Sequence, residues 1–246
     1  MMDFTIEKYR HLLTALKQHK EHRIRHDVDL KPEFSLRIAQ VESIMGMKAT
    51  YYFRSMHFES HAEVIKAIIA LGHEAGYHYE NLTTCNGDSE SAYQDFCKNL
   101  EILRKLVPVH TACAHGSPRS PWNSQDIWNQ HDIHTLGISY EPMMDTDFSK
   151  TLYLTDTGRR WDGYKFSVRD KVPQYQEQWE KEGLIFHHTD DIIHALNDLQ
   201  HPIHHKSLLI NTHPQRWMPF GTQWMKEACT QNIKNIAKRI IVCTKY

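Results

Sequence analysis

The sequence predicts an α/β protein built on a parallel sheet, and the order of its strand and helix patterns supports this. In the first half, short β-prone runs alternate with amphipathic helical patterns, in units of about 25–35 residues. Such repeats imply parallel strands joined by right-handed crossovers, in an open doubly wound sheet or a barrel. The 246 residues, 40% of them hydrophobic, suffice for a sizeable core without any linker or low-complexity segment. We therefore expect a single domain over residues 1–246.

The first half divides into four predicted strands and four helices with local start and stop signals. The predicted order is helix 4–18, strand 22–28, helix 32–45, strand 48–54, helix 59–71, strand 73–80, helix 89–106 and strand 109–115. Pro32 suits the first turn of its helix, and Gly46 and Gly72 suit helix ends. Ser89 is the expected N-cap of the longest helix in this half.

The second half is less regular, because a segment rich in proline and serine follows residue 115. Residues 116–165 are the expected lid over a functional site, since long irregular segments in compact domains are usually functional or floppy. Strands are predicted at 137–142, 151–155, 164–168, 186–189 and 208–217, and helices at 173–182, 190–199 and 222–239.

Composition excludes several classes of protein. The net charge of −1 argues against a general nucleic-acid binder, and no run of apolar residues is long enough to span a bilayer. The N-terminus lacks an apolar run of signal-peptide length, and none of the five cysteines form a Cys-x-x-Cys pair. Free thiols and a cytoplasmic location are therefore expected. The sequence gives no indication of the oligomeric state.

Asp27 and Asp29 follow the first predicted strand and would point to the same face. Like charges on one face are costly unless a metal, a cation or a proton separates their roles. Two simpler interpretations stay open for this pair. The run can be an acidic strand-end turn, and Asp29 can cap the helix that begins near Pro32.

Further polar groups follow other predicted strands: Arg54, His78 with Glu80, His115, and His213. In both candidate architectures the carboxyl ends of the strands lie at one edge. Asp, Glu and His together suit Zn²⁺ or another divalent ion that keeps one position open for water. An unligated carboxylate would then act as base and a histidine as acid.

This pattern indicates metal-assisted hydrolysis of an amide or an ester, although each residue also has a structural interpretation. His78 alone is more often a satisfied semi-buried histidine, and Glu80 can be a solvated loop residue. Trp161 and Trp217 are either core residues or an apolar wall for a sugar or an acyl group.

Five runs in register resemble the polysaccharide deacetylase family, carbohydrate esterase family 4 (CE4). They are His26–Asp29 in an Asp-x-Asp form, the strand Lys48–Arg54, Gly72–His78, His115–Pro118 near the family's Arg-x-Pro loop, and Leu209–Pro214. The resemblance implies a distorted (β/α) barrel of about seven parallel strands with a divalent metal, Zn²⁺ by preference. Position by position, it implies that Asp27 is the base, Asp29 and His78 are ligands, and His213 is the acid.

The chain departs from the family at two positions. Residue 82 is leucine where the family has its second metal histidine, so Glu80 is the expected third ligand, with His115 as the other candidate. The alternative is that the chain holds no tight metal site. The family's arginine in the third motif has no clear counterpart, since Arg119 lies beyond Pro118.

The implied reaction removes an acyl group, such as N-acetyl, from a sugar. A cytoplasmic location favours a nucleotide- or lipid-linked sugar in surface-polysaccharide assembly as the substrate. Four residues are expected to bind it: Arg54, His115, Trp161 and Trp217. Two alternatives remain, an inert deacetylase-like barrel that binds a glycan or a partner enzyme, and a hydrolase of another linear or cyclic amide.

Overall fold

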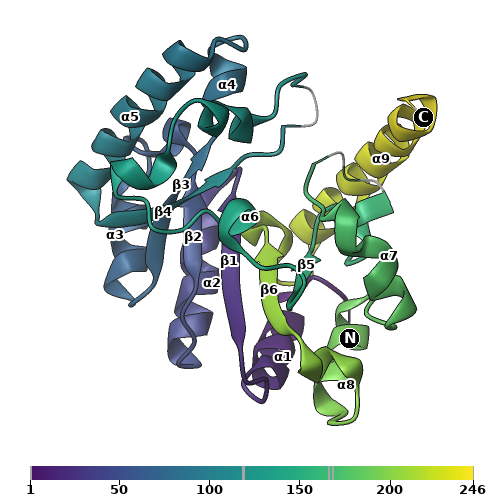
Figure 1. Ribbon diagram of the computed structural model, residues 1–246. Coiled ribbons are helices and arrows are strands. Elements are labelled where there is room, and N and C mark those ends of the chain that lie inside the picture. The colour runs from purple at the N-terminus through teal and green to yellow at the C-terminus, as the bar shows by residue number, and fades with distance from the viewer. Residues whose placement is uncertain (1, 118–119, 166, 168, 246) are drawn as a thin grey trace. The chain divides into compact units, whose positions relative to one another are not determined.

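The computed structural model describes residues 2–117, 120–165, 167 and 169–245 (Figure 1). Within these residues the strands are β1 (His22–Val28), β2 (Thr50–Phe53), β3 (Glu74–Tyr79), β4 (Val109–Ala114), β5 (Thr151–Thr155) and β6 (Ser207–Thr212). The helices are α1 (Ile6–Leu16), α2 (Pro32–Ile44), α3 (Ala62–Ala70), α4 (Asn81–Thr84), α5 (Ser89–Leu106), α6 (Pro142–Asp145), α7 (Pro173–Lys181), α8 (Thr189–Asn197) and α9 (Thr222–Lys245). None of the helices in these ranges is both long and apolar enough to cross a membrane.

The chain forms two compact units, which we call the central unit (His26–Thr146) and the terminal unit (Met1–Arg25 with Asp147–Tyr246). Strand β1 begins in the terminal unit and ends in the central one. The strand order is β4-β3-β2-β1 in the central unit and β1-β6-β5 in the terminal unit. The pairs β2–β3, β3–β4 and β5–β6 are parallel, which confirms the predicted α/β class; the described residues hold six strands. The expectation of one domain stays a prediction.

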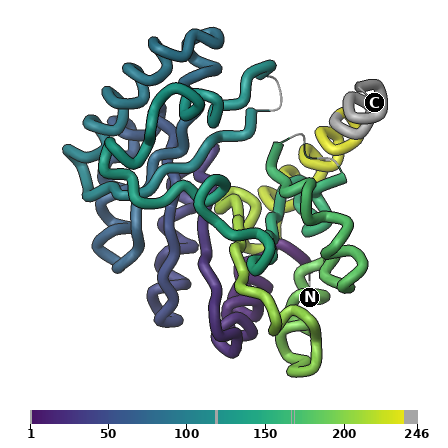
Figure 2. The backbone as a smooth tube through the Cα atoms, viewed as in Figure 1, coloured from purple at the N-terminus to yellow at the C-terminus, as the bar shows by residue number. Residues whose placement is uncertain are grey.

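The core of the central unit lies where α3 and α5 pack against β3. Strand β2 is buried almost throughout, with Tyr51, Tyr52 and Phe53 at most 1% exposed. Such continuous burial is typical of parallel strands covered on both faces. In the terminal unit, α1 packs against α8, and Figure 2 shows this purple helix beside the light-green one.

The predicted helix ends are largely confirmed. Gly46 and Gly72 adopt the left-handed conformation beyond α2 and α3, with φ of 68° and 91°. The N-cap of α5 was assigned to the wrong residue, because Asp88 accepts the hydrogen bond from the backbone N of Ser91. Ser89 instead occupies the first helical position.

In the described residues of the second half, two predicted strands are not found, and a third falls partly outside these residues. Residues 137–142 form only one bridge, between Thr111 and Tyr140, and Glu141 caps α6 by accepting from the backbone N of Met143. Residues 163–165 form a short 3-10 turn, and residues 166 and 168 lie outside the described ranges. The run 186–189 is no strand, because its end forms the start of α8, where the backbone N of His188 donates to Asp191. The predicted lid includes residues 118 and 119, which also lie outside the described ranges.

Candidate metal centre

Asp29, His78 and His115 bring three potential ligand atoms together in the central unit. Asp29 follows β1, His78 lies near the end of β3 and His115 follows β4. Asp29 Oδ1 lies 3.4 Å from His78 Nε2 and 3.5 Å from His115 Nε2. The carboxyl ends of parallel strands meet at one edge, which is why residues so far apart in the sequence converge here.

Hydrogen bonds fix how the two imidazole rings are oriented. His78 Nδ1 lies 3.0 Å from the carbonyl oxygen of Cys113, and His115 Nδ1 lies 2.8 Å from Glu80 Oε2. A carbonyl and an ionised carboxylate only accept, so these contacts assign the proton of each neutral ring to Nδ1. Both Nε2 lone pairs then face Asp29. Three converging acceptors repel one another unless a cation or a proton lies among them.

The charge balance at His78 agrees with this geometry. Burial disfavours a charged ring, but the carboxylates of Asp27 and Asp29 outweigh burial and raise the pKa of His78. The site therefore attracts positive charge. Two histidine nitrogens and one carboxylate oxygen, all within 4.8 Å of one another, form a ligand set that fits Zn²⁺ or a similar divalent ion.

Glu80 holds His115 in place. One of its oxygens accepts from the guanidinium of Arg54, with Nε at 3.1 Å, and the other accepts from His115. Burial would raise the pKa of Glu80, but the hydrogen bonds from His115 and Arg54 outweigh it and lower the pKa to about 2. Such a carboxylate–histidine pair is the usual support behind a metal ligand.

The structure therefore brings His115, rather than Glu80, into the three-residue group with Asp29 and His78. Leu82 sits in α4 with only 4% of its surface exposed, so position 82 offers core packing and no donor. The third candidate ligand, His115, therefore follows β4, whereas the resemblance implies a ligand from the segment after β3. Arg54 contacts Glu80, and its expected role in substrate binding stays a prediction.

Asp27 is the second carboxylate of the site and lies deeper than Asp29. It is 5% exposed, and its Oδ2 lies 3.9 Å from His78 Nε2. His26, the residue before it, faces the other way and bonds to Glu42 at 2.8 Å behind the strand. Because successive side chains of a β-strand point to opposite faces, His26 bonds in the core while Asp27 faces the site.

The interpretation of Asp29 as a helix cap is wrong. The N-cap of α2 is Lys31, which makes no side-chain capping bond. The side chain of Asp29 instead faces the two histidines, and its backbone carbonyl accepts from His57 Nε2 at 3.1 Å.

His213 belongs to a separate polar cluster in the terminal unit. Its Nδ1 lies 2.6 Å from Asp156 Oδ1, and Asp156 also accepts from Arg216 at 2.5 Å and from the indole of Trp217 at 2.8 Å. Asp156 is fully buried; burial would raise its pKa, but Arg216 and His213 outweigh burial and lower the pKa to about 2. The Arg216 guanidinium also lies 2.8 Å from His213 Nδ1, so this ring nitrogen contacts both the carboxylate and the guanidinium.

Sequence reasoning missed Asp156, since Asp156-Thr157-Gly158 was interpreted only as a turn. Its position directly after β5 was the available signal. Trp161 and Trp217 are core residues of the terminal unit rather than a sugar-binding wall. Their exposed fractions are 5% and 1%, and the Trp161 indole donates to Thr189 at 2.9 Å.

Comparison with known proteins gives the fold. No family model and no curated protein matches the chain. Among solved structures, a CE4 esterase from Streptococcus mutans matches with a TM-score of 0.50 and 12% identity, over 99% of this chain and 88% of that one. The chain has the fold of the CE4 polysaccharide deacetylases. This confirms the expected α/β deacetylase-like architecture.

Two further structures match less closely. A CE4 family pseudoenzyme from Bacillus anthracis gives a TM-score of 0.45 at 13% identity, over 89% of this chain and 62% of that one. A mutant of the peptidoglycan deacetylase PdaC from Bacillus subtilis gives 0.43 at 13% identity, over 90% and 96%. The chain thus spans less than two thirds of the length of the pseudoenzyme.

Proposed function

We propose that this protein is a metal-dependent deacetylase that removes an acyl group, N-acetyl by preference, from a sugar. One observation supports this proposal: His78 Nε2, His115 Nε2 and Asp29 Oδ1 converge beside the carboxylate of Asp27. In this arrangement one carboxylate belongs to the ligand set, while the other remains available for proton transfer. Metal-assisted hydrolysis requires such a division of roles.

Asp29, His78 and His115 would hold the cation, with Zn²⁺ best suited to their two nitrogens and one oxygen. When bound, it would polarise the acyl carbonyl and lower the pKa of a water molecule. Asp27 accepts the proton of the attacking water. Glu80 and the Cys113 carbonyl keep both rings turned towards Asp29.

His213 is the proposed acid that protonates the leaving nitrogen. Its Nδ1 lies against Asp156 and Arg216, so Nε2 is the ring nitrogen that we assign to proton exchange.

We propose a nucleotide- or lipid-linked sugar as the substrate, in surface-polysaccharide assembly and with a cytoplasmic location. The five cysteines of the sequence include no Cys-x-x-Cys pair, which suits a reducing compartment. Turnover of nucleotide-linked, lipid-linked and polymeric N-acetyl sugars by the purified protein tests this assignment. Hydrolysis of polymers alone would contradict it.

The central test is Asp27→Asn. We expect acetate release to fall by about 10²- to 10⁴-fold, the usual contribution of a general base. Zn²⁺ content, measured by elemental analysis, should stay unchanged because Asp27 is not a member of the proposed ligand set. Asp147→Asn, an exposed change, is the matched control. Full activity in Asp27→Asn would exclude this mechanism.

One observation favours an inert barrel that binds a glycan or a partner enzyme as the second candidate: the buried Leu82 at the family's usual ligand position. Purified protein that binds Zn²⁺ and oligosaccharides but hydrolyses no acylated sugar would support that candidate. Hydrolysis of non-sugar amides alone would support an amidohydrolase instead.

A further inference from the structure

We propose that the central unit contains a second, overlapping cation position, formed by Asp27, His78 and Cys113 and selective for thiophilic metals. We call these three residues the inner set, and Asp29, His78 and His115 the outer set. In both sets the ligand atoms lie within 4.8 Å of one another. Since both sets use His78, one cation at a time can take its Nε2.

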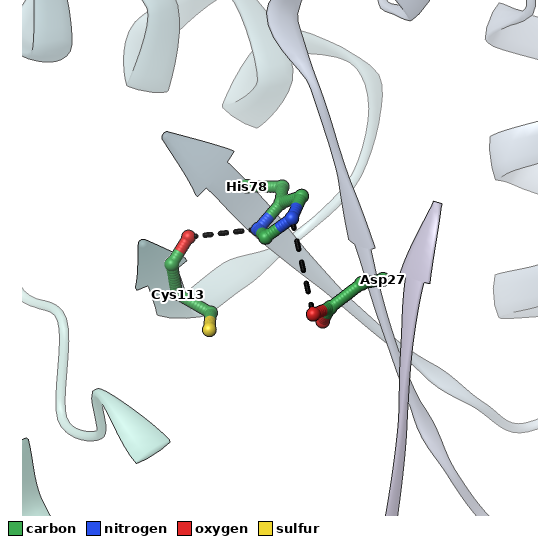
Figure 3. Close-up of side chains that lie close together, drawn as sticks. All are labelled: Asp27, His78 and Cys113. Atoms are coloured by element: carbon green, nitrogen blue, oxygen red, sulfur yellow. Dashed lines mark hydrogen bonds and ion pairs between the residues drawn. The ribbon is translucent and has the colours of Figure 1, made fainter. Parts of the chain in front are cut away.

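The β3–β4 register explains how Cys113 reaches this position. Cys113 is the direct partner of His78 across the two parallel strands, so both side chains leave the sheet on the same face. The carbonyl of Cys113 also accepts from His78 Nδ1, which turns Nε2 towards Asp27 Oδ2 at 3.9 Å. Figure 3 shows Asp27 and Cys113 flanking the imidazole.

Burial and ligand type distinguish the two sets. In the inner set Asp27 is 5%, His78 2% and Cys113 0% exposed, whereas Asp29 and His115 of the outer set are partly exposed. Sulfur is a soft donor that favours Cd²⁺ and Co²⁺ over Mg²⁺ and Mn²⁺. Binding to the inner set releases the thiol proton of Cys113 to solvent and leaves a thiolate ligand.

If the proposed function holds, a cation in the inner set prevents catalysis by Asp27. It engages the carboxylate that would otherwise accept the proton of water. A thiophilic metal at this position therefore inhibits deacetylation, while a cation in the outer set leaves Asp27 available. Cys113 thus makes the activity dependent on the identity of the metal.

The experiment is a Co²⁺ titration of the metal-free full chain, followed by absorption spectroscopy. We expect a near-ultraviolet sulfur-to-cobalt charge-transfer band, beside the visible d–d bands that report binding of any kind. Cys113→Ser should lose the charge-transfer band, whereas Cys97→Ser, a half-buried thiol outside both sets, should keep it. A band that persists in Cys113→Ser, or d–d bands alone in the unmodified protein, would overturn the inner set.

A second measurement needs no variant of the buried thiol. X-ray absorption of the Cd²⁺-loaded protein should show one sulfur neighbour, and a shell of nitrogen and oxygen only would overturn the proposal. The Cd²⁺ concentration that halves acetate release should rise at least about tenfold in Cys113→Ser. The spectroscopic result stands even if no acylated sugar is hydrolysed, so failure of the proposed function and failure of the inner set are separable.

Discussion

Among single residues, Glu80 illustrates how one carboxylate sets the geometry of another side chain. It lies between Arg54 and His115 and accepts from both, so it aligns a histidine without joining the ligand group. A residue in this role affects the metal through the orientation of its neighbour. Sequence spacing alone could not separate this role from direct ligation. Glu80 and His78 are two residues apart, so in an extended segment both side chains would point to the same face.

Glu80→Gln should lower Zn²⁺ affinity by about 10- to 100-fold, the usual cost of losing the support behind a ligating histidine. A neutral amide offers one acceptor where the carboxylate offers two, so it cannot hold both Arg54 and His115. Competition with a chromophoric chelator measures the affinity. The control is Glu74→Gln, an exposed residue at the start of β3 that accepts a hydrogen bond from Thr50. Equal affinities in the two variants would show that Glu80 has no such role.

Among the elements, β3 depends on a close approach that only glycine permits. A Cβ at Gly76 would lie 2.4 Å from Cδ1 of Tyr52 and 3.1 Å from Cγ2 of Thr111. Tyr52 is buried and bonds to Thr111 at 2.7 Å, so its ring has little room to move. Gly76 is the second glycine of the run Gly72–His78, and its part in that motif is to let Tyr52 pack across β3, two residues before His78.

Gly76→Ala should therefore destabilise the fold by about 1–3 kcal/mol, the usual cost of overpacking a filled core. The same change should weaken Zn²⁺ binding, because displacement of Tyr52 disturbs the strand that carries His78. Urea unfolding and the chelator titration measure the two effects. Gly221→Ala is the matched control, since no atom lies within 4 Å of its added Cβ and its φ is not positive. Similar unfolding midpoints for both variants would contradict this account of Gly76.

For the whole molecule, the Asp156 cluster ties stability to pH. The pKa of Asp156 is lowered from 3.8 to about 2, so this carboxylate contributes stability that is fully present above its unfolded pKa. The contribution falls as pH drops from about 4 towards 2, because the unfolded chain takes up the proton first. We expect the urea midpoint to decrease over this acidic window.

Asp156→Asn should lower the free energy of unfolding at neutral pH by about 3–5 kcal/mol, because it leaves the charge of Arg216 buried without its carboxylate. It should also reduce the acid dependence between pH 4 and 2. Urea unfolding at several pH values checks both effects. Asp126→Asn provides a control in which an exposed aspartate is changed. An unchanged pH profile in Asp156→Asn would rule out Asp156 as the source of the acid sensitivity.

Much of the architecture could be predicted from the sequence, because its signals are local. Strand–helix alternation predicted β1 to β4 and the helices between them, and the glycines after α2 and α3 marked their ends. Asp27, Asp29 and His78 were proposed as site residues because side chains at parallel strand ends converge at one edge. The strands predicted at 137–142 and 186–189 are wrong, because the end of each segment forms the start of a helix. Glu141 caps α6, and the backbone N of His188 donates to Asp191 of α8.

By itself, the sequence determined the α/β class, the resemblance to CE4 deacetylases and the acidic pair after β1. Only the tertiary structure decided that His115 joins Asp29 and His78, that Glu80 supports it, and that Cys113 stands beside His78. It also decided that His213 is held by Asp156. These relations depend on the lateral register of strands and on contacts between distant residues, which the spacing of residues along one chain does not encode.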